Sequence, residues 1–231
     1  MTYGPKAWRI TALICARNEA ENLPHVLPLI PEFVDEALMI DGHSTDETVA
    51  VAERLRPGIR VLQQPGTGKG VALRYGVEQA TGDIIVTLDA DGETDPRELP
   101  RFLDALLSGG DFIKGSRFRD GWGNKPPHRV FGNWVIAKTC NILYGTRFTD
   151  VCCGYNAFWR RVSDEVDLWA ADGWNYEPLI VARLLRARRD VRELGYPYHG
   201  RLSGESKLPN WRQGLGAVWV LARERFRRRP T

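Results

Sequence analysis

Four carboxylates lie close together in the segment VTLDADGETDP, at residues 86–96. They are Asp89, Asp91, Glu93 and Asp95, and they follow an apolar run that predicts a buried strand. Like charges at this spacing repel, and their ionised forms cost free energy unless a cation lies among them. Carboxylate oxygens bind Mg²⁺ or Mn²⁺, and magnesium is usually completed by waters and substrate phosphates. The spacing therefore leaves two interpretations, a metal site that holds a diphosphate and a solvated acidic turn before a helix.

A glycine-rich turn, GTGKG at residues 66–70, invites comparison with a phosphate-binding loop. A P-loop needs glycine at position 63 and serine or threonine at position 70, where this chain has Gln63 and Gly70. The pattern G-x-G-x-x-G also fails, because Val71 stands where the third glycine belongs. The turn therefore argues against an ATPase, and it leaves Lys69 as either a phosphate ligand or an ordinary surface lysine.

Short apolar runs alternate with helical patterns through the first half of the chain, as in α/β folds. The runs predict strands at residues 9–16, 36–40, 59–64, 83–89 and 111–116. The patterns between them predict helices at residues 21–30, 45–55, 70–80 and 96–107. Ser44 and Glu47 have the spacing of a capping box before the second of these helices. This rhythm predicts a mostly parallel sheet covered by helices on both faces.

In such sheets, ligands bind beyond the carboxyl ends of the strands. The candidate polar residues follow the predicted strands, at residues 17–19, 41, 89–91 and 115–117. This coincidence predicts one site at that edge of the sheet.

The second half is less regular. Residues 119–129 are rich in glycine and proline and predict a loop. Helices are expected at residues 130–144 and 174–189, and a strand at residues 154–159 with a polar helix after it. No repeat and no linker divides the chain, so its 231 residues predict a single α/β domain.

The C-terminal segment has the pattern of an amphipathic helix with a basic end. One predicted face carries Trp211, Leu215, Val218, Trp219, Ala222 and Phe226. The end carries Arg223, Arg225, Arg227, Arg228 and Arg229. Two interpretations remain open, a helix lying on an anionic membrane surface and a helix packed on the core with a solvated basic end.

Composition excludes several classes of protein. A net charge of +3 is too small to indicate nucleic acid as a partner. No run reaches the roughly 18 apolar residues that a membrane-spanning helix needs, and the N-terminus lacks a signal-peptide pattern. Cys15, Cys140, Cys152 and Cys153 lack zinc-binding spacing. We expect reduced thiols in a cytoplasmic protein, either free in the cytoplasm or peripheral on the membrane's cytoplasmic face.

Six motifs occur in the order found in family 2 glycosyltransferases, and the chain most resembles the dolichol-phosphate mannosyltransferase-like branch. They are ARNEAENLP, IDGHSTDET, GKGVALRYG, ATGDIIVTLDADGETDP, GSRF and RLSGESKL, spread over residues 11–208. The resemblance implies a GT-A fold, a single nucleotide-sugar-binding α/β domain at residues 1–208. Residues 209–231 would then be the C-terminal amphipathic basic helix, part of the same domain or peripheral to a membrane.

The resemblance also implies roles for particular residues. The residues that line the nucleotide base and ribose would be Ala16, Arg17, Glu19 and Asp41. The Mg²⁺ or Mn²⁺ corner would comprise Asp89, Asp91 and Glu93, with Asp89 closer to the ribose. The phosphates of the donor would contact Arg117, Arg201, Ser206 and Lys207, whose cationic side chains suit phosphate oxygens.

Three departures from the family pattern leave the base and the sugar open. Tyrosine is more frequent where Arg17 stands. The second strand often ends in two acids, whereas here Gly42 follows Asp41. Glu93 stands where the polyprenyl-phosphate enzymes often have glutamine.

The implied reaction develops negative charge on a leaving diphosphate, which the metal, Arg117, Arg201 and Lys207 would stabilise. A phosphate acceptor arrives largely ionised, with a second pKa of about 6, and needs no general base. A hydroxyl acceptor would need one. Asp150 in TDVCCGYNAF is the first candidate and Glu177 in NYEPL the second, with a loop cap and a helix-terminal acid as the alternatives.

We therefore expect a metal-dependent, inverting hexosyltransferase that moves a sugar such as mannose or glucose from a GDP- or UDP-sugar to a polyprenyl phosphate. The residues expected to act in the reaction are Asp91, Arg117, Asp150 and Lys207. Three alternatives remain: a soluble hydroxyl acceptor with the same donor chemistry, a sugar nucleotidyltransferase, and a nucleotide-sugar-binding module without turnover.

Overall fold

The computed structural model describes residues 7–119, 127–166, 175–197, 200 and 211–227. The strands are β1 Ile10–Ala16, β2 Glu36–Asp41, β3 Arg60–Gln63, β4 Ile84–Asp89, β5 Phe112–Ser116, β6 Asn156–Trp159 and β7 Val191–Gly195. The helices are α1 Thr48–Leu55, α2 Lys69–Gln79, α3 Leu99–Leu107, α4 Pro127–Tyr144, α5 Arg160–Glu165, α6 Tyr176–Arg186 and α7 Trp211–Phe226. Short 3-10 turns are at Leu23–His25, Leu27–Leu29 and Pro96–Glu98.

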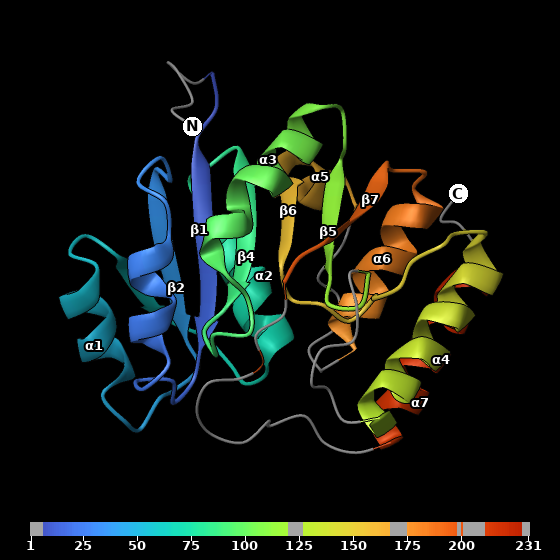
Figure 1. Ribbon diagram of the computed structural model, residues 1–231, viewed down its shortest axis with the longest axis horizontal. Coiled ribbons are helices and arrows are strands. Elements are labelled where there is room, and N and C mark those ends of the chain that lie inside the picture. The colour runs from blue at the N-terminus through green and yellow to red at the C-terminus, as the bar shows by residue number, and fades with distance from the viewer. Residues whose placement is uncertain (1–6, 120–126, 167–174, 198–199, 201–210, 228–231) are drawn as a thin grey trace.

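The strands form one seven-stranded sheet in the order β3-β2-β1-β4-β6-β5-β7 (Figure 1). Six strands run in one direction, and β6 runs against its neighbours β4 and β5. The mostly parallel sheet expected from the sequence is therefore confirmed. One edge of the sheet gathers the carboxyl ends of the six parallel strands and the amino end of β6, so the loops at this edge can build a site.

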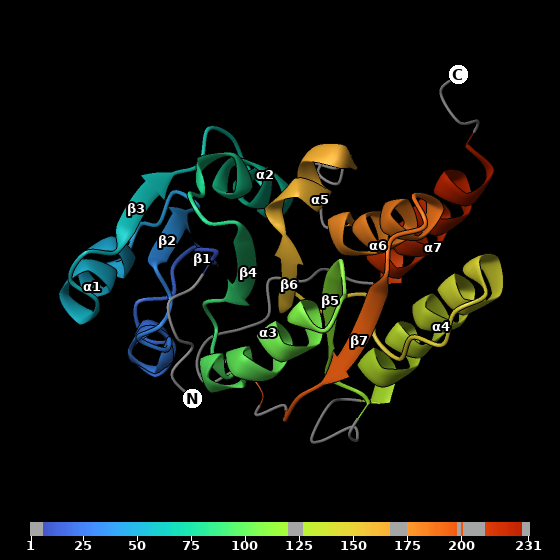
Figure 2. The same cartoon turned by 90° about the horizontal axis from the view of Figure 1, so that it is seen from above.

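Helices cover both faces of the sheet, because successive side chains of a strand point to opposite sides. In β1, Ile10, Ala12 and Ile14 pack into one apolar cluster with residues of α1 and α3. The intervening Leu13 packs into a second cluster with residues of α2, α5 and α6. Figure 2 shows α3 on one side of the sheet and α2, α5 and α6 on the other. The central strands β2, β1, β4, β6 and β5 are buried on both faces, so their ends are the parts available for chemistry.

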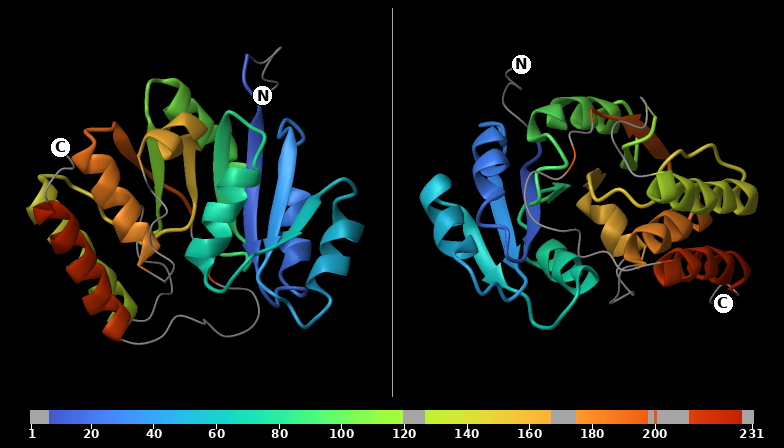
Figure 3. Two further views of the ribbon diagram at one scale, coloured as in Figure 1. Left: turned by 180° about the vertical axis from the view of Figure 1, so that it is seen from behind. Right: turned by 60° about the horizontal axis from the view of Figure 1, so that its bottom comes forward.

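A third apolar cluster joins α4, α6 and α7 beyond the β7 end of the sheet. Helices α4 and α7 lie side by side (Figures 1 and 3). The buried face of α7 includes Ala217, Val220 and Leu221, whereas Leu215 and Trp219 of the predicted apolar face are exposed. The helix predicted at the C-terminus is therefore present, but it packs through a different face from the one that the spacing indicated.

Two local predictions for the first half are wrong. Residues 21–30 form 3-10 turns rather than a helix, because proline lacks the N–H group that an α-helix needs and Pro24 and Pro28 interrupt the segment. The capping box is absent as well. Helix α1 begins at Thr48, and the Ser44 hydroxyl accepts the Asn18 N–H at 2.9 Å.

In the second half, strand β7 was missed. It lies next to β5, and its residues up to Leu194 are only half-buried. Arg192 and Glu193 interrupt its apolar pattern, so the sequence did not indicate a strand. The predicted strand at residues 154–159 spans only Asn156–Trp159, and the helix predicted at 174–189 spans Tyr176–Arg186.

We expect Gly76→Ala in α2 to destabilise the fold although alanine is the better helix former. An added Cβ would lie 2.9 Å from Leu13 Cδ2 and 3.0 Å from Ile40 Cγ1, so the loss of about 1–3 kcal/mol from overpacking should outweigh the gain in helix propensity. Gly132→Ala in α4 is the matched control, because an added Cβ there meets no atom within 4 Å and should stabilise by roughly 0.5–1 kcal/mol. Urea unfolding measures the change in the free energy of unfolding for both variants. Equal changes would contradict the close packing of Gly76 against Leu13 and Ile40.

Candidate active site

The ends of β1, β2 and β4 bring the predicted nucleotide-binding residues together. Strand pairing sets Ala16 opposite Asp41 and Cys15 opposite Asp89. Residues of three separate motifs thus share one edge of the sheet. Because adjacent strands are about 4.8 Å apart, these side chains lie within the span of one nucleotide.

Local contacts fix the two acids at the β1 and β2 ends. Glu19 is buried, and its carboxylate accepts a hydrogen bond of 2.6 Å from the Asn22 amide. Asp41 is buried, and its carboxylate accepts the Ser44 N–H at 3.1 Å. Arg17 follows β1 directly and is exposed. The structure therefore holds the two acids rigidly at this edge, with an exposed guanidinium beside them on the chain.

A lysine neutralises the first acid of the D-x-D pair. The Lys69 ammonium donates to the Asp89 carboxylate and lies 5.9 Å from the centre of the Tyr176 ring. Burial pushes the pKa of Asp89 upward, but the charge and hydrogen bond of Lys69, together with the charges of Arg117 and Lys114, outweigh it and the net pKa is lowered. Lys69 is thus a partly buried lysine that pairs with a carboxylate, and its role as a phosphate ligand stays a prediction.

The second acid of the pair, Asp91, lies among other carboxylates. Burial, followed by the nearby Asp89 and Glu93 carboxylates, raises the pKa of Asp91 to about 7. Within the described residues, no three His, Cys, Asp or Glu side chains already converge on a metal position. An octahedral Mg²⁺ needs only one or two carboxylates besides substrate phosphates and waters, so Asp91 and its neighbours fit a divalent cation that arrives with the donor.

An arginine that follows β5 directly, Arg117, faces the acidic corner formed by Asp89, Asp91 and Glu93, and a buried acid anchors it. Arg117 Nε donates to Asp150 Oδ2 at 2.8 Å, and Arg117 Nη1 lies 3.9 Å from Glu93 Oε2. Asp150 is fully buried, and the Arg117 charge, against the effect of burial, holds the pKa of Asp150 below its usual value. Arg117 therefore stays charged and points toward the acidic corner.

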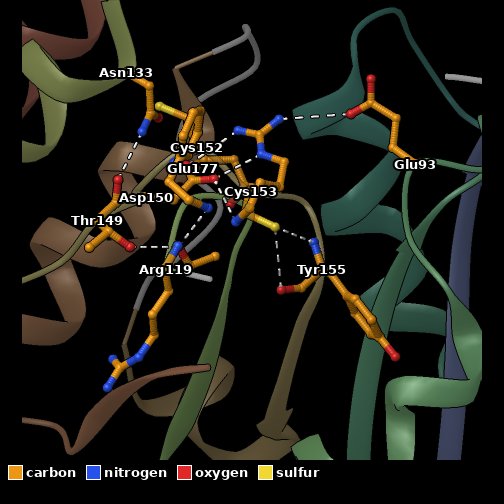
Figure 4. A network of polar contacts seen from close by, with 12 residues as sticks. Glu93, Arg119, Asn133, Thr149, Asp150, Cys152, Cys153, Tyr155 and Glu177 are labelled. Carbon is orange, nitrogen blue, oxygen red and sulfur yellow. Dashed lines mark hydrogen bonds and ion pairs between the residues drawn. The ribbon is translucent and has the colours of Figure 1, made fainter. Parts of the chain in front are cut away.

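Asp150 belongs to a loop that several elements fasten (Figure 4). Glu193 of β7 accepts the N–H groups of Thr149 at 2.7 Å and of Asp150 at 2.9 Å. Asn133 of α4 donates to the Thr149 carbonyl at 2.9 Å. The Asp150 carboxylate also accepts the Cys152 N–H at 2.9 Å. The loop is thus held on three sides, which fixes Asp150 and through it the guanidinium of Arg117.

A buried ion pair also supports the loop that carries Asp150. The Lys114 ammonium donates to the Glu177 carboxylate and to the Cys153 carbonyl. Both side chains are nearly inaccessible, at 1% for Lys114 and 6% for Glu177. As general bases, Asp150 and Glu177 stay predictions, and each carboxylate would first have to leave its ion pair.

Steric closeness explains one glycine of this loop. A Cβ on Gly154 would lie 2.8 Å from Asp89 Oδ1, so any side chain there would displace the acid. Loop and acidic corner are therefore built in direct contact.

Three predicted phosphate ligands, Arg201, Ser206 and Lys207, lie outside the described residues. Their roles remain predictions.

Three residues that the sequence reasoning missed hold the site together, namely Lys114, Asn133 and Glu193. A signal existed for Lys114, since a charged residue in the apolar strand DFIKGS requires a buried partner. Glu193 was hidden because its strand was missed.

The cysteines offer no nucleophile. All four are free, and burial raises the pKa of Cys15, Cys140 and Cys152 to about 12 and that of Cys153 to about 11. Protonated thiols are poor nucleophiles, so the chemistry of this corner rests on acids and cationic side chains.

We expect Asp91→Asn to stabilise the metal-free protein at pH 8, by about 1–3 kcal/mol after allowance for partial exposure, and to abolish turnover. The folded protein binds the Asp91 proton more tightly than the unfolded chain, so stability falls as pH rises from the ordinary aspartate pKa of 3.8 to the raised pKa of about 7. The gain should therefore vanish near pH 4.

Urea unfolding at both pH values measures this, with the exposed Asp164→Asn in α5 as the control. An equal gain at pH 4 and pH 8 would exclude charge repulsion as its cause.

Comparison with known proteins agrees with this geometry. The family model described as "Glycosyl transferase family 2" matches residues 11–167. The dolichyl-phosphate hexose transferase of Haloferax volcanii is 31% identical over 218 residues, covering 91% of this chain and 92% of the relative. The undecaprenyl-phosphate mannosyltransferase of Micrococcus luteus is 30% identical over 242 residues, covering 94% and 99%.

A solved structure shows the same fold. Glucosyl-3-phosphoglycerate synthase from Mycobacterium tuberculosis, in complex with Mn²⁺, UDP-glucose and phosphoglyceric acid, superposes with a TM-score of 0.74 at 19% identity. The match covers 95% of this chain and 80% of that one. This chain belongs to glycosyl transferase family 2 and has the GT-A fold that its motifs predicted.

Proposed function

We propose that this enzyme transfers a hexose, with inversion, from a GDP- or UDP-sugar to the phosphate of a polyprenyl phosphate. The observation that carries the proposal is the meeting of the Asp89–Asp91 pair with Arg117 at one edge of the sheet. The named activities of the Haloferax and Micrococcus relatives support a lipid-phosphate acceptor.

Asp89, Asp91 and Glu93 would hold Mg²⁺ or Mn²⁺, which would neutralise the donor diphosphate. The raised pKa of Asp91 supports this assignment, because burial and the neighbouring carboxylates disfavour its ionised form, which a divalent cation would stabilise. The Lys69 ammonium contacts Asp89. It would therefore lie close to a donor phosphate that a cation held beside this carboxylate.

Negative charge grows on the leaving diphosphate as the bond to the anomeric carbon breaks. Arg117 is held ready for that charge, since Asp150 fixes it before the donor binds. A group that needs no reorientation stabilises a transition state most effectively. Arg201, Ser206 and Lys207 would complete the phosphate contacts.

A phosphate acceptor fits the protonation states of the site. Such an acceptor is largely ionised at neutral pH and attacks without a general base. The buried, ion-paired state of Asp150 supports a role in positioning Arg117. A soluble hydroxyl acceptor is the alternative, and it would require Asp150 or Glu177 to leave its ion pair and accept a proton.

The test is a panel of GDP- and UDP-linked mannose and glucose with Mn²⁺, assayed for nucleoside diphosphate release with and without polyprenyl phosphate. Release should depend on the lipid phosphate. Asp91→Ala and Lys207→Ala should each lower turnover by about 100-fold or more, because each removes charge stabilisation in the transition state.

Asp164→Ala in α5 and Lys138→Ala in α4, both exposed, are the matched controls and should retain turnover. Full turnover in both site variants would refute the site assignment. Transfer to soluble acceptors but not to polyprenyl phosphate would refute the acceptor.

We also infer that α4 and α7 rest on the membrane that carries the acceptor. Within the described part of the chain, no helix is long and apolar enough to cross a bilayer. Six of the seven large apolar side chains that are exposed in that part lie on these two helices: Phe131, Trp134, Ile142, Leu215, Trp219 and Phe226. Aromatic side chains beside arginine are typical of helices at a lipid surface. Here the Arg223 guanidinium lies 4.8 Å from the centre of the Trp219 ring.

Vesicle flotation tests the membrane contact. Trp134→Gln combined with Trp219→Gln should lower binding to vesicles of phosphatidylcholine and phosphatidylglycerol by about 10-fold, since two exposed aromatic rings no longer enter the interface. Leu107→Gln on α3 changes the seventh exposed apolar side chain and should leave binding intact. Unchanged flotation of the double variant would exclude these helices as the contact.

A further inference from the structure

Three helices end at a corner of the molecule that the reaction does not use. The ends of α4, α6 and α7 surround an open pocket of about 700 Å³. Its charged lining consists of four arginines, Arg186, Arg188, Arg225 and Arg227, and no acidic residue lines it. A volume of this size is ordinary for a small-molecule site.

The pocket is remote from the acidic corner. Helix α4 connects the two places: Asn133 near its start holds the loop of Asp150, and Tyr144 at its end lines the pocket. Eleven residues of α-helix separate them, which is roughly 16 Å.

One carboxylate organises the arginines. Glu224 of α7 is 1% exposed and lies 3.1 Å from Arg186, 3.4 Å from Arg223 and Arg227, and 3.7 Å from Arg183. A single negative charge cannot neutralise four guanidinium groups. Excess positive charge therefore remains, and Glu224 fixes the directions in which the guanidinium groups point.

The other two arginines of the pocket add charge without a described acidic partner. Arg225 Nε donates to the Leu143 carbonyl at 2.8 Å, which leaves its terminal nitrogens to the pocket. Among the residues that the structure describes, no carboxylate forms an ion pair with Arg188 or Arg225. Part of the arginine charge compensates the partial negative charge of the helix ends, but carbonyl groups carry no net charge.

Arg188 occupies a backbone position that favours glycine. Its φ of 57° is left-handed, and the N–H groups of Arg188 and Arg189 return to the carbonyls of Leu185 at 3.1 Å and Leu184 at 3.0 Å. This is a Schellman motif with arginine at its left-handed residue. At the ends of helices α3 and α4, by contrast, the residue with positive φ is a glycine: Gly109 with φ 108° and Gly145 with φ 70°.

An arginine kept in a strained conformation is a reason to look for function at that position. Its side chain lines the pocket with the other three. Guanidinium groups bind phosphate through paired N–H donors, and several around one pocket favour an anion with more than one negative charge.

We propose that the pocket at the ends of α4, α6 and α7 binds a phosphate group of multiple charge, separately from the donor site. The phosphate belongs either to a free phosphorylated molecule or to the headgroup of an anionic lipid. Ile142, 82% exposed in the pocket lining, would suit the second source.

Inorganic pyrophosphate is the probe for the first source, measured by calorimetry on the full chain in EDTA at constant ionic strength. Arg188→Gly with Arg225→Gln should weaken its binding at least 10-fold. Arg188→Gly alone should fold as well as the wild type or better, because glycine relieves the left-handed strain, so a loss of binding cannot be ascribed to misfolding.

Arg54→Gln on α1 is the matched charge control and should change affinity less than 2-fold. Arg117→Gln reports any pyrophosphate bound in the active site. The free-phosphate source is excluded if the pocket variants have the same affinity for pyrophosphate as the Arg54 variant. It is also excluded if Arg117→Gln is the only variant that weakens pyrophosphate binding.

Vesicles of phosphatidylcholine with and without phosphatidic acid test the second source with the same variants. Dependence of either pyrophosphate or phosphatidic acid binding on Arg188 and Arg225 supports the site and identifies the source. Independence of both from these arginines overturns the proposal.

Discussion

The buried pair of Asp150 and Arg117 is the constraint on which this site depends. Asp150 accepts N–H groups from Arg117 and Cys152, and burial in a low dielectric makes those hydrogen bonds strong. The guanidinium is thereby placed before any substrate arrives. The loop contacts from β7 and α4 and the Lys114–Glu177 pair all serve to keep Asp150 where it is. The orientation of the Arg117 guanidinium thus depends on a network that reaches far outside the site.

Opposite that network, the acidic corner is destabilised by its own charge. Asp89 is compensated by Lys69, whereas Asp91 is kept near neutrality by its neighbours. A fold normally avoids such repulsion, and local conflict of this kind concentrates where function demands it. The cost in stability therefore falls on Asp91, which is also a carboxylate of the proposed metal site.

The sequence predicted the sheet and the acidic corner because both follow from short-range patterns. Apolar runs indicated six of the seven strands, and the acids that follow the fourth run, including Asp89 and Asp91, indicated an acidic corner at the end of that strand. Prediction from the sequence failed where contacts between residues far apart in the chain determine the structure. Pro24 and Pro28 broke an expected helix, Arg192 and Glu193 masked a strand, and the buried face of α7 was set by α4 and α6 rather than by its own periodicity. The pairing of Asp150 with Arg117 could not be derived, since 33 residues separate the two along the chain.

The reversed strand β6 has a geometric effect on catalysis. Asn156 lies between Thr87 of β4 and Lys114 of β5, so one strand separates the tips that carry the acids and the guanidinium. Two strand spacings place the backbones of the two tips about 10 Å apart. The side chains reach across this distance, since Arg117 Nη1 lies 3.9 Å from Glu93 Oε2. Because β6 is antiparallel, the chain enters it at this same edge, and the segment before it fills the floor between the two tips. The direction of a single four-residue strand, β6, thus fixes both the distance between the two tips and the segment that lies between them.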